Sequence, residues 1–167
     1  MQLSPSVYVS GSDRDMLSAS KPMRILLSSV SSDSHTWNLV FLQLFLEFKG
    51  HEVHNLGGCT PDSEIIATCE EMAPDLLVIS SVNGHGNIDG ERLIRKLRQN
   101  DLLSDLPVAI GGKLGIHGVE KAQHIDWLLD VGFTAVFEAS SSIGLFEDFI
   151  KGVSAQLSRP EAVGAMS

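Results

Sequence analysis

The chain has 167 residues, 43% of them hydrophobic and 20% charged, which is typical of one soluble globular domain rather than a disordered or fibrous chain. Its 12 basic side chains are outnumbered by 21 acidic ones, and the formal net charge of −9 argues against binding to nucleic acid or to an anionic membrane. No apolar run approaches the roughly 20 residues that span a bilayer. The two cysteines, Cys59 and Cys69, lack the spacing of a zinc site or disulfide framework, so we expect a reducing cytoplasm.

The first half of the chain alternates short apolar runs with segments of helical periodicity. Strands are predicted at 24–29, 52–55 and 75–80, the last an apolar run typical of a strand covered on both faces. A helix is predicted over 37–49, and we expect Trp37 in the core rather than stacked on a ligand. A second helix opens at Thr60 and Pro61, with Thr60 as its N-cap. The apolar face of the first helix consists of Trp37, Val40, Phe41, Leu44, Phe45 and Phe48.

The second half repeats the pattern, with helices predicted over 89–100, 119–131 and 143–157 and strands at 107–110 and 134–137. We expect one domain over 23–157, a flexible N-terminal extension over 1–22 and a flexible tail over 158–167. Five strand–helix units joined by short loops imply right-handed crossovers and an open parallel sheet. The predicted fold is therefore α/β and doubly wound, with a flavodoxin-like five-stranded sheet of order 2-1-3-4-5 and a ligand at the carboxyl ends of its strands.

Four loops at that edge are rich in Ser and Gly, namely those at 31–36, 80–86, 111–113 and 138–142. Small residues let a large ligand approach the backbone, and hydroxyl groups can hydrogen-bond to it. Neither a Walker-type phosphate loop nor a Gly-x-Gly-x-x-Gly after the first strand is present in the sequence. The edge therefore predicts a large ligand without the standard nucleotide motifs.

The most specific feature of these loops is Asp33-Ser34-His35. An acid two residues before a His can accept a hydrogen bond from one ring N–H, which fixes the tautomer and strengthens the other nitrogen as a metal ligand. The same residues also suit a helix start, with Asp33 or Ser34 as N-cap and His35 in solvent. Taken by themselves, the three residues favour the cap.

Three segments in chain order change that balance. Asp33-Ser-His35-Thr-Trp-Asn38 follows the first strand, Ser80-Ser81 and Gly84-His-Gly86-Asn-Ile-Asp89 follow the third, and Gly111-Gly112 follows the fourth. Over about residues 24–150 the chain resembles the small cobalamin-binding subunit of glutamate mutase (methylaspartate mutase), whose pattern begins Asp-x-His-x-x-Gly. The resemblance implies a cobalamin-binding domain that serves an adenosylcobalamin-dependent isomerase interconverting glutamate and 3-methylaspartate.

The resemblance also implies roles for individual residues. His35 would replace the cofactor's dimethylbenzimidazole as the lower cobalt ligand, and Asp33 would accept its other N–H. Ser80 would hydrogen-bond the displaced nucleotide tail in a slot beside the first strand, and Gly111 and Gly112 would leave it room. A large barrel-type subunit would hold the amino acid, so this chain would carry no catalytic residue of its own. The remaining expected cofactor-binding residues are Ser32, Ser34, Thr36, Asn38, Val82, Asn83, Gly84, Lys113 and Ser140.

One residue departs from the family pattern. Asn38 stands where the motif ends in Gly, and its side chain adds bulk and polarity beside the expected tail. Either the Asn amide bonds the tail or the affinity for the cofactor falls. Cobalt ligation depends on His35 and is less affected by this change.

The other histidines and the cysteines are assigned simpler roles. His85 either touches the corrin or the partner, or is solvated. His51, His54, His117 and His124 are expected at the surface, and Cys59 and Cys69 are expected to be structural because neither has the neighbours of a nucleophile.

Three other functions fit the same fold. A response-regulator receiver needs a phospho-accepting Asp after the third strand and a Lys after the fifth, where this chain has Ser80 and Glu138. A flavodoxin usually sandwiches its flavin between aromatic residues, which the later loops lack. Corrinoid carriers and cobalamin-dependent regulators share the Asp-x-His motif but usually carry a helical domain ahead of it, for which some 22 residues leave no room. A carrier or regulatory module without mutase activity stays the alternative.

Overall fold

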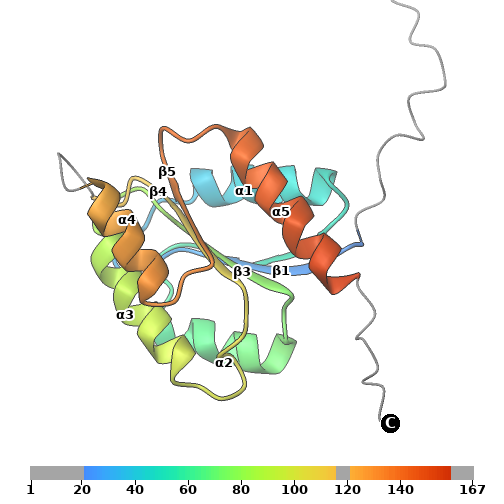
Figure 1. Cartoon of the computed structure of the whole chain (residues 1–167), viewed down its shortest axis with the longest axis horizontal. Coiled ribbons are helices and arrows are strands. Elements are labelled where there is room, and N and C mark those ends of the chain that lie inside the picture. Colours follow the sequence, from blue (N-terminus) through green and yellow to red (C-terminus); the bar gives the residue numbers. More distant parts are fainter. Residues whose placement is uncertain (1–20, 116–120, 159–167) are drawn as a thin grey trace, which may run out of the picture.

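The structure, a computed structural model, describes residues 21–115 and 121–158, which form a parallel sheet flanked by helices (Figure 1). The predicted segments 1–22 and 158–167 lie outside this part of the chain, apart from residues 21, 22 and 158. The elements are, in chain order, β1 (Arg24–Ser28), α1 (Trp37–Phe48), β2 (Glu52–Asn55), α2 (Asp62–Met72), β3 (Leu76–Ser81), α3 (Gly86–Arg98), β4 (Val108–Gly112), α4 (Lys121–Asp130), β5 (Ala135–Glu138) and α5 (Ile143–Leu157).

The five strands are all parallel and lie in the order β2-β1-β3-β4-β5, which confirms the predicted sheet. In the centre of the sheet Leu27 pairs with Val78 of β3, and Ile79 pairs with Ile110 of β4. Helices α1 and α5 lie together on one face, and α2, α3 and α4 cover the other (Figure 1). This is the doubly wound α/β arrangement, in which loops at the carboxyl edge are free to bind a ligand.

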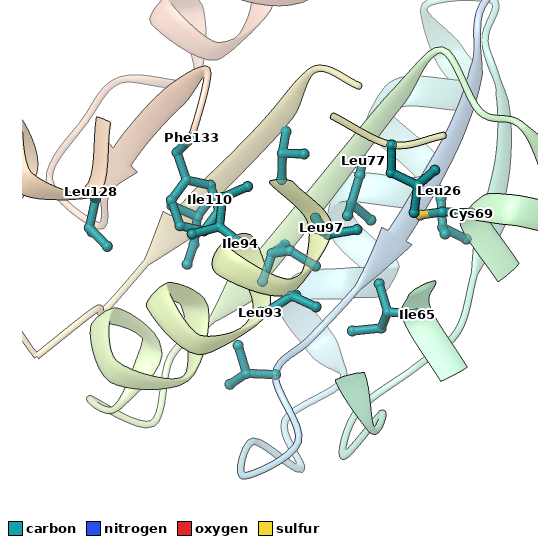
Figure 2. Packing of buried hydrophobic residues seen from close by; sticks show 14 of the residues in the cluster. Leu26, Ile65, Cys69, Leu77, Leu93, Ile94, Leu97, Ile110, Leu128 and Phe133 are labelled. Carbon is teal, nitrogen blue, oxygen red and sulfur yellow. The ribbon is translucent and has the colours of Figure 1, made fainter. Parts of the chain in front are cut away.

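The core has two layers because alternate strand residues point to opposite faces of the sheet. Leu26 and Leu77 point toward α2 and α3 and pack in a cluster with Ile65, Leu93 and Leu97 (Figure 2). The residues on either side of Leu26 belong to the other cluster, which α1 and α5 complete. Every residue of β3 is buried, as predicted for a strand covered on both faces.

Some element ends differ from the prediction. Helix α3 begins at Gly86 rather than at 89, and β4 extends through Gly112, so the Gly-Gly pair lies in the strand rather than after it. The N-cap of α2 is Pro61 rather than the predicted Thr60. The Thr60 hydroxyl instead donates to the Gly57 carbonyl at 3.1 Å. None of the helices in the described residues is long and apolar enough to cross a bilayer.

The expectation that Trp37 lies in the core is wrong, since 85% of the residue is exposed. Helix α1 has apolar residues on nearly all of its sides, and the ones that it buries against the sheet are Leu39 and Leu46. The side chains of its predicted apolar face lie mostly in solvent, with Phe41 57% and Phe48 86% exposed. Periodicity cannot choose between two apolar faces of one helix, and packing against the sheet makes the choice.

The expectation that His51 lies at the surface is also wrong. It is buried just before β2, and its Nδ1 accepts a hydrogen bond of 3.2 Å from the Met23 backbone N–H. The bond supplies a partner to an amide that comes before β1 and would otherwise be buried without one. His54 is exposed as expected, and His117 lies outside the described residues.

Candidate cofactor-binding site

Asp33 is the most connected side chain at the carboxyl edge of the sheet. It lies in the loop between β1 and α1 and is completely buried. Its Oδ2 accepts hydrogen bonds from the backbone N–H groups of Val82 and Asn83, at 2.6 and 3.2 Å, and from the Ser81 hydroxyl at 3.0 Å. The carboxylate thus ties the loop after β1 to the loop after β3, fifty residues along the chain.

The other oxygen of Asp33 serves His35. Oδ1 lies 2.6 Å from His35 Nδ1 and accepts the His35 backbone N–H at 3.0 Å. Burial by itself would raise the pKa of Asp33, but hydrogen bonds from the backbone of His35 and Val82 and from the side chains of His35 and Ser81 lower it to about 2. The group is therefore a carboxylate at neutral pH, and it acts as a fixed acceptor for the imidazole.

His35 itself is held on one side and open on the other. Its Nδ1 faces Asp33, while 59% of its side chain is exposed, so Nε2 is the nitrogen left for a ligand. The N-cap of α1 is Thr36, without a side-chain capping bond, so neither Asp33 nor Ser34 caps this helix. The geometry is that of a carboxylate–histidine pair in which the acid fixes the tautomer. Ser34 and Thr36, also expected to bind the cofactor, are both exposed in the same loop.

A second set of hydrogen bonds connects the start of the loop between β1 and α1 to Asn83 and to helix α3. The Ser32 hydroxyl donates to the Asp89 carboxylate, and the Asn83 amide donates to the carbonyl and hydroxyl of Ser32 at 3.0 and 2.9 Å. Arg92 binds the carboxylates of both Asp89 and Asp62. The Arg92 guanidinium holds the pKa of Asp62 below its usual range, and these charges are thereby paired.

A cavity of about 350 Å³ opens between α1 and α5, over the carboxyl halves of β3, β4 and β5. Its volume lies in the range of small-molecule sites, about 300–1,000 Å³. Its walls are mostly apolar, with polar groups from five residues and from the Gly-Gly backbone. The lining residues are Asn38, Phe41, Leu42, Val78, Ile79, Ser80, Val82, Ala109, Ile110, Gly111, Gly112, Phe137, Glu138, Ala139, Ser141, Ser142, Ile143 and Phe146.

Asn38 and Ser80 form the polar corner of this cavity. The Asn38 amide nitrogen donates to Ser80 Oγ at 2.7 Å, so the Ser80 hydroxyl hydrogen stays available for another acceptor. The Asn38 carbonyl oxygen Oδ1 is buried and has no hydrogen-bond partner among the described residues. A buried acceptor left unpaired is costly, and a ligand with a donor at this point would satisfy it.

Three glycines permit close backbone contacts around the site. A Cβ on Gly58 would lie 2.9 Å from the Asp33 carbonyl oxygen, which accepts the Cys59 N–H at 2.7 Å. Gly112 has φ +112°, and a Cβ there would lie 2.1 Å from the Ser81 carbonyl oxygen. A Cβ on Gly111 would meet Phe137 at 3.1 Å. Gly111 and Gly112 are therefore close to the neighbouring strands β5 and β3, where a side chain would collide. This packing requirement is separate from their expected role of leaving room for a ligand.

The structure brings most, but not all, of the predicted site residues together. Asn38, Ser80, Val82, Gly111 and Gly112 line the cavity. Gly84 and Lys113 pair through a backbone hydrogen bond of 3.1 Å at the edge, and neither lines the cavity. Ser140 is also absent from the lining, whereas its neighbours Ser141 and Ser142 belong to it.

Sequence reasoning missed several residues of the site. In the sequence Ser81 stands out only as half of the Ser80-Ser81 pair, although its hydroxyl donates a hydrogen bond to Asp33. The sequence predicts the aromatic residues of the cavity wall only as parts of helices and of a strand, namely Phe41, Phe137 and Phe146. Their position in the sequence could have predicted them as lining residues. Phe41 and Phe146 lie within two helical turns of a predicted ligand loop, and Phe137 directly precedes one. The Asp89–Arg92 contacts had no signal beyond the final Asp of the glycine-rich stretch.

The donor set suits a metal that brings its own ligands. No group of three or more His, Cys, Asp or Glu side chains in the described residues could hold a bare metal ion. One oriented imidazole near a mostly apolar cavity instead fits a metal complex with a single free position and an attached organic arm. Cobalt in a corrin ring is such a complex, with the nucleotide tail as the arm.

Comparison with curated proteins points the same way. Glutamate mutase sigma subunits are similar to this chain at low identity over most of its length. That of Halobacterium salinarum is 27% identical over 135 residues, which cover 81% of this chain and 89% of the relative. That of Fusobacterium nucleatum subsp. nucleatum is 25% identical over 120 residues, covering 72% and 88%.

Solved structures confirm the fold. A cobalamin-binding protein from Desulfitobacterium hafniense DCB-2 matches with a TM-score of 0.60 and 23% identity, covering 77% of this chain and 60% of that one. A signal receiver domain of a histidine kinase from Syntrophus aciditrophicus matches with a TM-score of 0.63 and 17% identity, covering 84% and 96%. These two likenesses establish architecture only. The match that identifies the family is the B12 binding domain, over residues 23–128, and the chain belongs to that family as a cobalamin-binding domain distantly related to glutamate mutase sigma subunits.

Proposed function

We propose that this chain is the cobalamin-binding subunit of a glutamate mutase-like isomerase, with residues 23–157 as its cobalamin-binding domain and His35 as the lower axial ligand of cobalt. The observation that carries the proposal is the Asp33–His35 pair at the carboxyl edge, 2.6 Å apart, with the carboxylate buried and the imidazole more than half exposed. A carboxylate that accepts the hydrogen bond of the other ring nitrogen raises the basicity of the imidazole and fixes its orientation.

The cavity beside His35 is proposed to receive the nucleotide tail. Phe41, Phe137 and Phe146 supply apolar walls for an aromatic base, and Ser80 and Asn38 supply hydrogen bonds to it. Val82, whose N–H is bonded to Asp33, joins the two parts of the site, because it lines the cavity as well. The edge residues Ser32, Ser34, Thr36, Asn83, Gly84, Lys113 and Ser140 are proposed to surround the corrin.

The proposed cofactor is adenosylcobalamin, which when bound supplies a radical for rearranging a carbon skeleton. This chain would bind and orient it, and a large barrel-type subunit would hold glutamate. The loops of the edge support this division, because Lys113 is the single cation in their sequence and Arg92 is paired with two carboxylates. A substrate with two carboxylates calls for charge-assisted, preferably bidentate, partners.

Reconstitution tests the proposal. The purified chain is mixed with adenosylcobalamin, a glutamate mutase large subunit and glutamate, and 3-methylaspartate is measured. Turnover that needs both chains, and that His35→Ala abolishes, is the expected result. Cobalamin binding without turnover in the presence of a large subunit that forms a complex with this chain would overturn the mutase role and favour a carrier or regulator. Failure to bind cobalamin at all would overturn the site.

A further inference from the structure

The loop between β1 and α1 must hold His35 in place, because the imidazole lies largely in solvent. Its Nδ1 bonds to Asp33, and 59% of the side chain is exposed. The helix that follows begins at an N-cap, Thr36, that makes no side-chain capping bond. A group that binds a metal complex has to be held within about 0.5 Å of its working position. The direction of the ring therefore depends on how the backbone of this loop is fixed.

Two serines at the start of the loop are bonded to helix α3. Arg92 Nη2 donates to the Ser31 hydroxyl at 2.9 Å, and the Ser32 hydroxyl donates to the Asp89 carboxylate. Arg92 Nη1 donates to Asp89 Oδ1 at 2.5 Å, so the guanidinium also orients the carboxylate that binds Ser32. Asp33 follows Ser32 directly in the chain. These contacts therefore act immediately ahead of the carboxylate that orients the imidazole.

Arg92 is itself fixed by a second carboxylate. Its Nε and Nη2 donate to the two oxygens of Asp62 at 2.7 and 3.0 Å, which is the bidentate arrangement of a guanidinium on a carboxylate. Asp62 lies at the start of α2 and is buried. The hydrogen bonds between the two groups raise the pKa of Arg92 and lower that of Asp62. The planar fork reaches Asp62, Asp89 and Ser31 at once, which the single ammonium group of a lysine cannot do.

The apolar core already holds α3 against the sheet. Leu93, Ile94 and Leu97 of this helix are fully buried. The Arg92 side chain is 41% exposed, and ion pairs that are partly solvated add little net stability. What the guanidinium supplies is direction, because its hydrogen bonds join α2, α3 and the loop in one fixed geometry.

We propose that Arg92 and Asp89 are positioning residues for His35. They act through the hydroxyls of Ser31 and Ser32, and they hold the imidazole in one tautomer with its Nε2 in one direction. The inference rests on the proposed function of His35 as the cobalt ligand. It also gives a role to the final acid of the glycine-rich stretch after β3, which the sequence shows without a purpose.

Binding of cobalamin to full-length variants tests the proposal. Arg92→Lys keeps the charge but loses the fork, and it should weaken binding about 10-fold, the lower end of the range for groups that support a metal-binding histidine. Lys96→Met is the matched control, because Lys96 donates to the same Asp62 at 2.8 Å, one helical turn further along α3. It should leave the affinity unchanged. Wild-type affinity in Arg92→Lys, or an equal loss in both variants, would overturn the proposal.

The route through the two serines has its own test. Ser31→Ala and Ser32→Ala together remove both hydroxyls through which Arg92 and Asp89 act. Adding Arg92→Lys to this double variant should cause no further loss of affinity, because changes that remove the same contact are not additive. A further loss as large as in the wild-type background would show that Arg92 acts elsewhere, and it would overturn the route.

The tautomer of His35 separates this inference from the function on which it rests, because it is measured without a cofactor. Nuclear magnetic resonance of ¹⁵N-histidine protein at about pH 8, above the range in which histidines usually titrate, distinguishes hydrogen on Nδ1 from hydrogen on Nε2. His35→Ala assigns the signal. The wild type should carry the hydrogen on Nδ1, toward Asp33, and Arg92→Lys should populate both tautomers.

A merely structural Arg92 would lower the free energy of unfolding in urea but leave the tautomer of the folded variant unchanged, and that result would overturn the positioning role. If the tautomer changes as expected while the wild type fails to bind cobalamin, the proposed function is overturned and the positioning role stands.

Discussion

Asp33 has two structural functions, of which the sequence predicts only one. It orients His35 through Oδ1, and it receives two backbone amides and one hydroxyl from the segment after β3 through Oδ2. The Asp-x-His spacing predicts the first function. The second depends on contacts about fifty residues apart, which no local pattern records. The carboxylate is thus both a positioning group for the imidazole and a link between loops.

Asp33→Asn should weaken cobalamin binding by roughly 10–100-fold, the usual effect of losing a carboxylate behind a metal-binding histidine. An Asn amide presents an NH₂ group where Oδ1 or Oδ2 now accepts, so we also expect a loss of about 1–3 kcal/mol in the free energy of unfolding. Absorbance titration with cobalamin measures the first effect and urea denaturation the second. Asp101→Asn, in an exposed turn, is the matched control. Cobalamin affinity equal to that of the wild type would mean that Asp33 is purely structural.

Asn38 is the residue at which this chain departs from the motif, and the structure gives its side chain a partner in Ser80. Its buried Oδ1 lacks one. We expect Asn38→Ala to weaken cobalamin binding by about 5–10-fold, the value of one hydrogen bond of about 1–1.5 kcal/mol. Binding of cobinamide, the corrin without a nucleotide tail, should not change. An equal loss for both ligands would place Asn38 against the corrin instead of the tail.

At the scale of elements, the strands and the extent of helix α1 were predictable, but the face that α1 buries against the sheet was not. Apolar runs such as the one in β3 have one interpretation, a strand covered on both faces, and the structure confirms it. Helix α1 offers two apolar faces, and the choice of Leu39 and Leu46 over Trp37 and Phe48 is made by the sheet. The cavity could not be predicted from the sequence either, because its walls come from α1, α5 and the ends of three strands that are far apart along the chain.

His51, at the junction of α1 and β2, predicts a pH dependence of folding. Burial lowers the pKa of its imidazole below the ordinary value of 6.5, and its neutral Nδ1 accepts the Met23 N–H. The unfolded chain therefore binds a proton more readily than the folded one below about pH 6.5. Stability from this group is fully present above the unfolded-state pKa of 6.5, and it is lost as the pH falls below that value through the lowered pKa of the folded state.

Urea denaturation at a series of pH values between 7.5 and 5 measures this loss. Asp33 and Asp62 do not contribute in this range, because their pKa values are lowered from 3.8 and they take up protons only at lower pH. His51→Gln, which keeps an acceptor but cannot titrate, should flatten the dependence over this range. His54→Gln, at an exposed position, is the control and should leave the slope as it is. A slope that persists in His51→Gln would assign it to another group.

At the scale of the whole molecule, the proposed division between two subunits predicts that this chain binds a cobalamin but not a dicarboxylic amino acid. The chain alone should bind cobalamin and show no saturable binding of glutamate, because its edge loops contain Lys113 as their single cation. Equilibrium dialysis against labelled glutamate, with and without adenosylcobalamin, checks this. Stoichiometric glutamate binding by the chain alone would contradict the division of labour between two subunits.

The most direct measurement concerns the bond between His35 and cobalt. Protein labelled with ¹⁵N at histidine is loaded with cobalamin, reduced to the paramagnetic cobalt(II) state, and examined by electron paramagnetic resonance. If His35 is the lower ligand, each superhyperfine feature should change from the three lines of a ¹⁴N neighbour to the two lines of ¹⁵N, and His35→Ala should lose this change. A spectrum that labelling leaves unaltered would contradict the account, because cobalt would then be bound by the cofactor's own base or by no protein nitrogen.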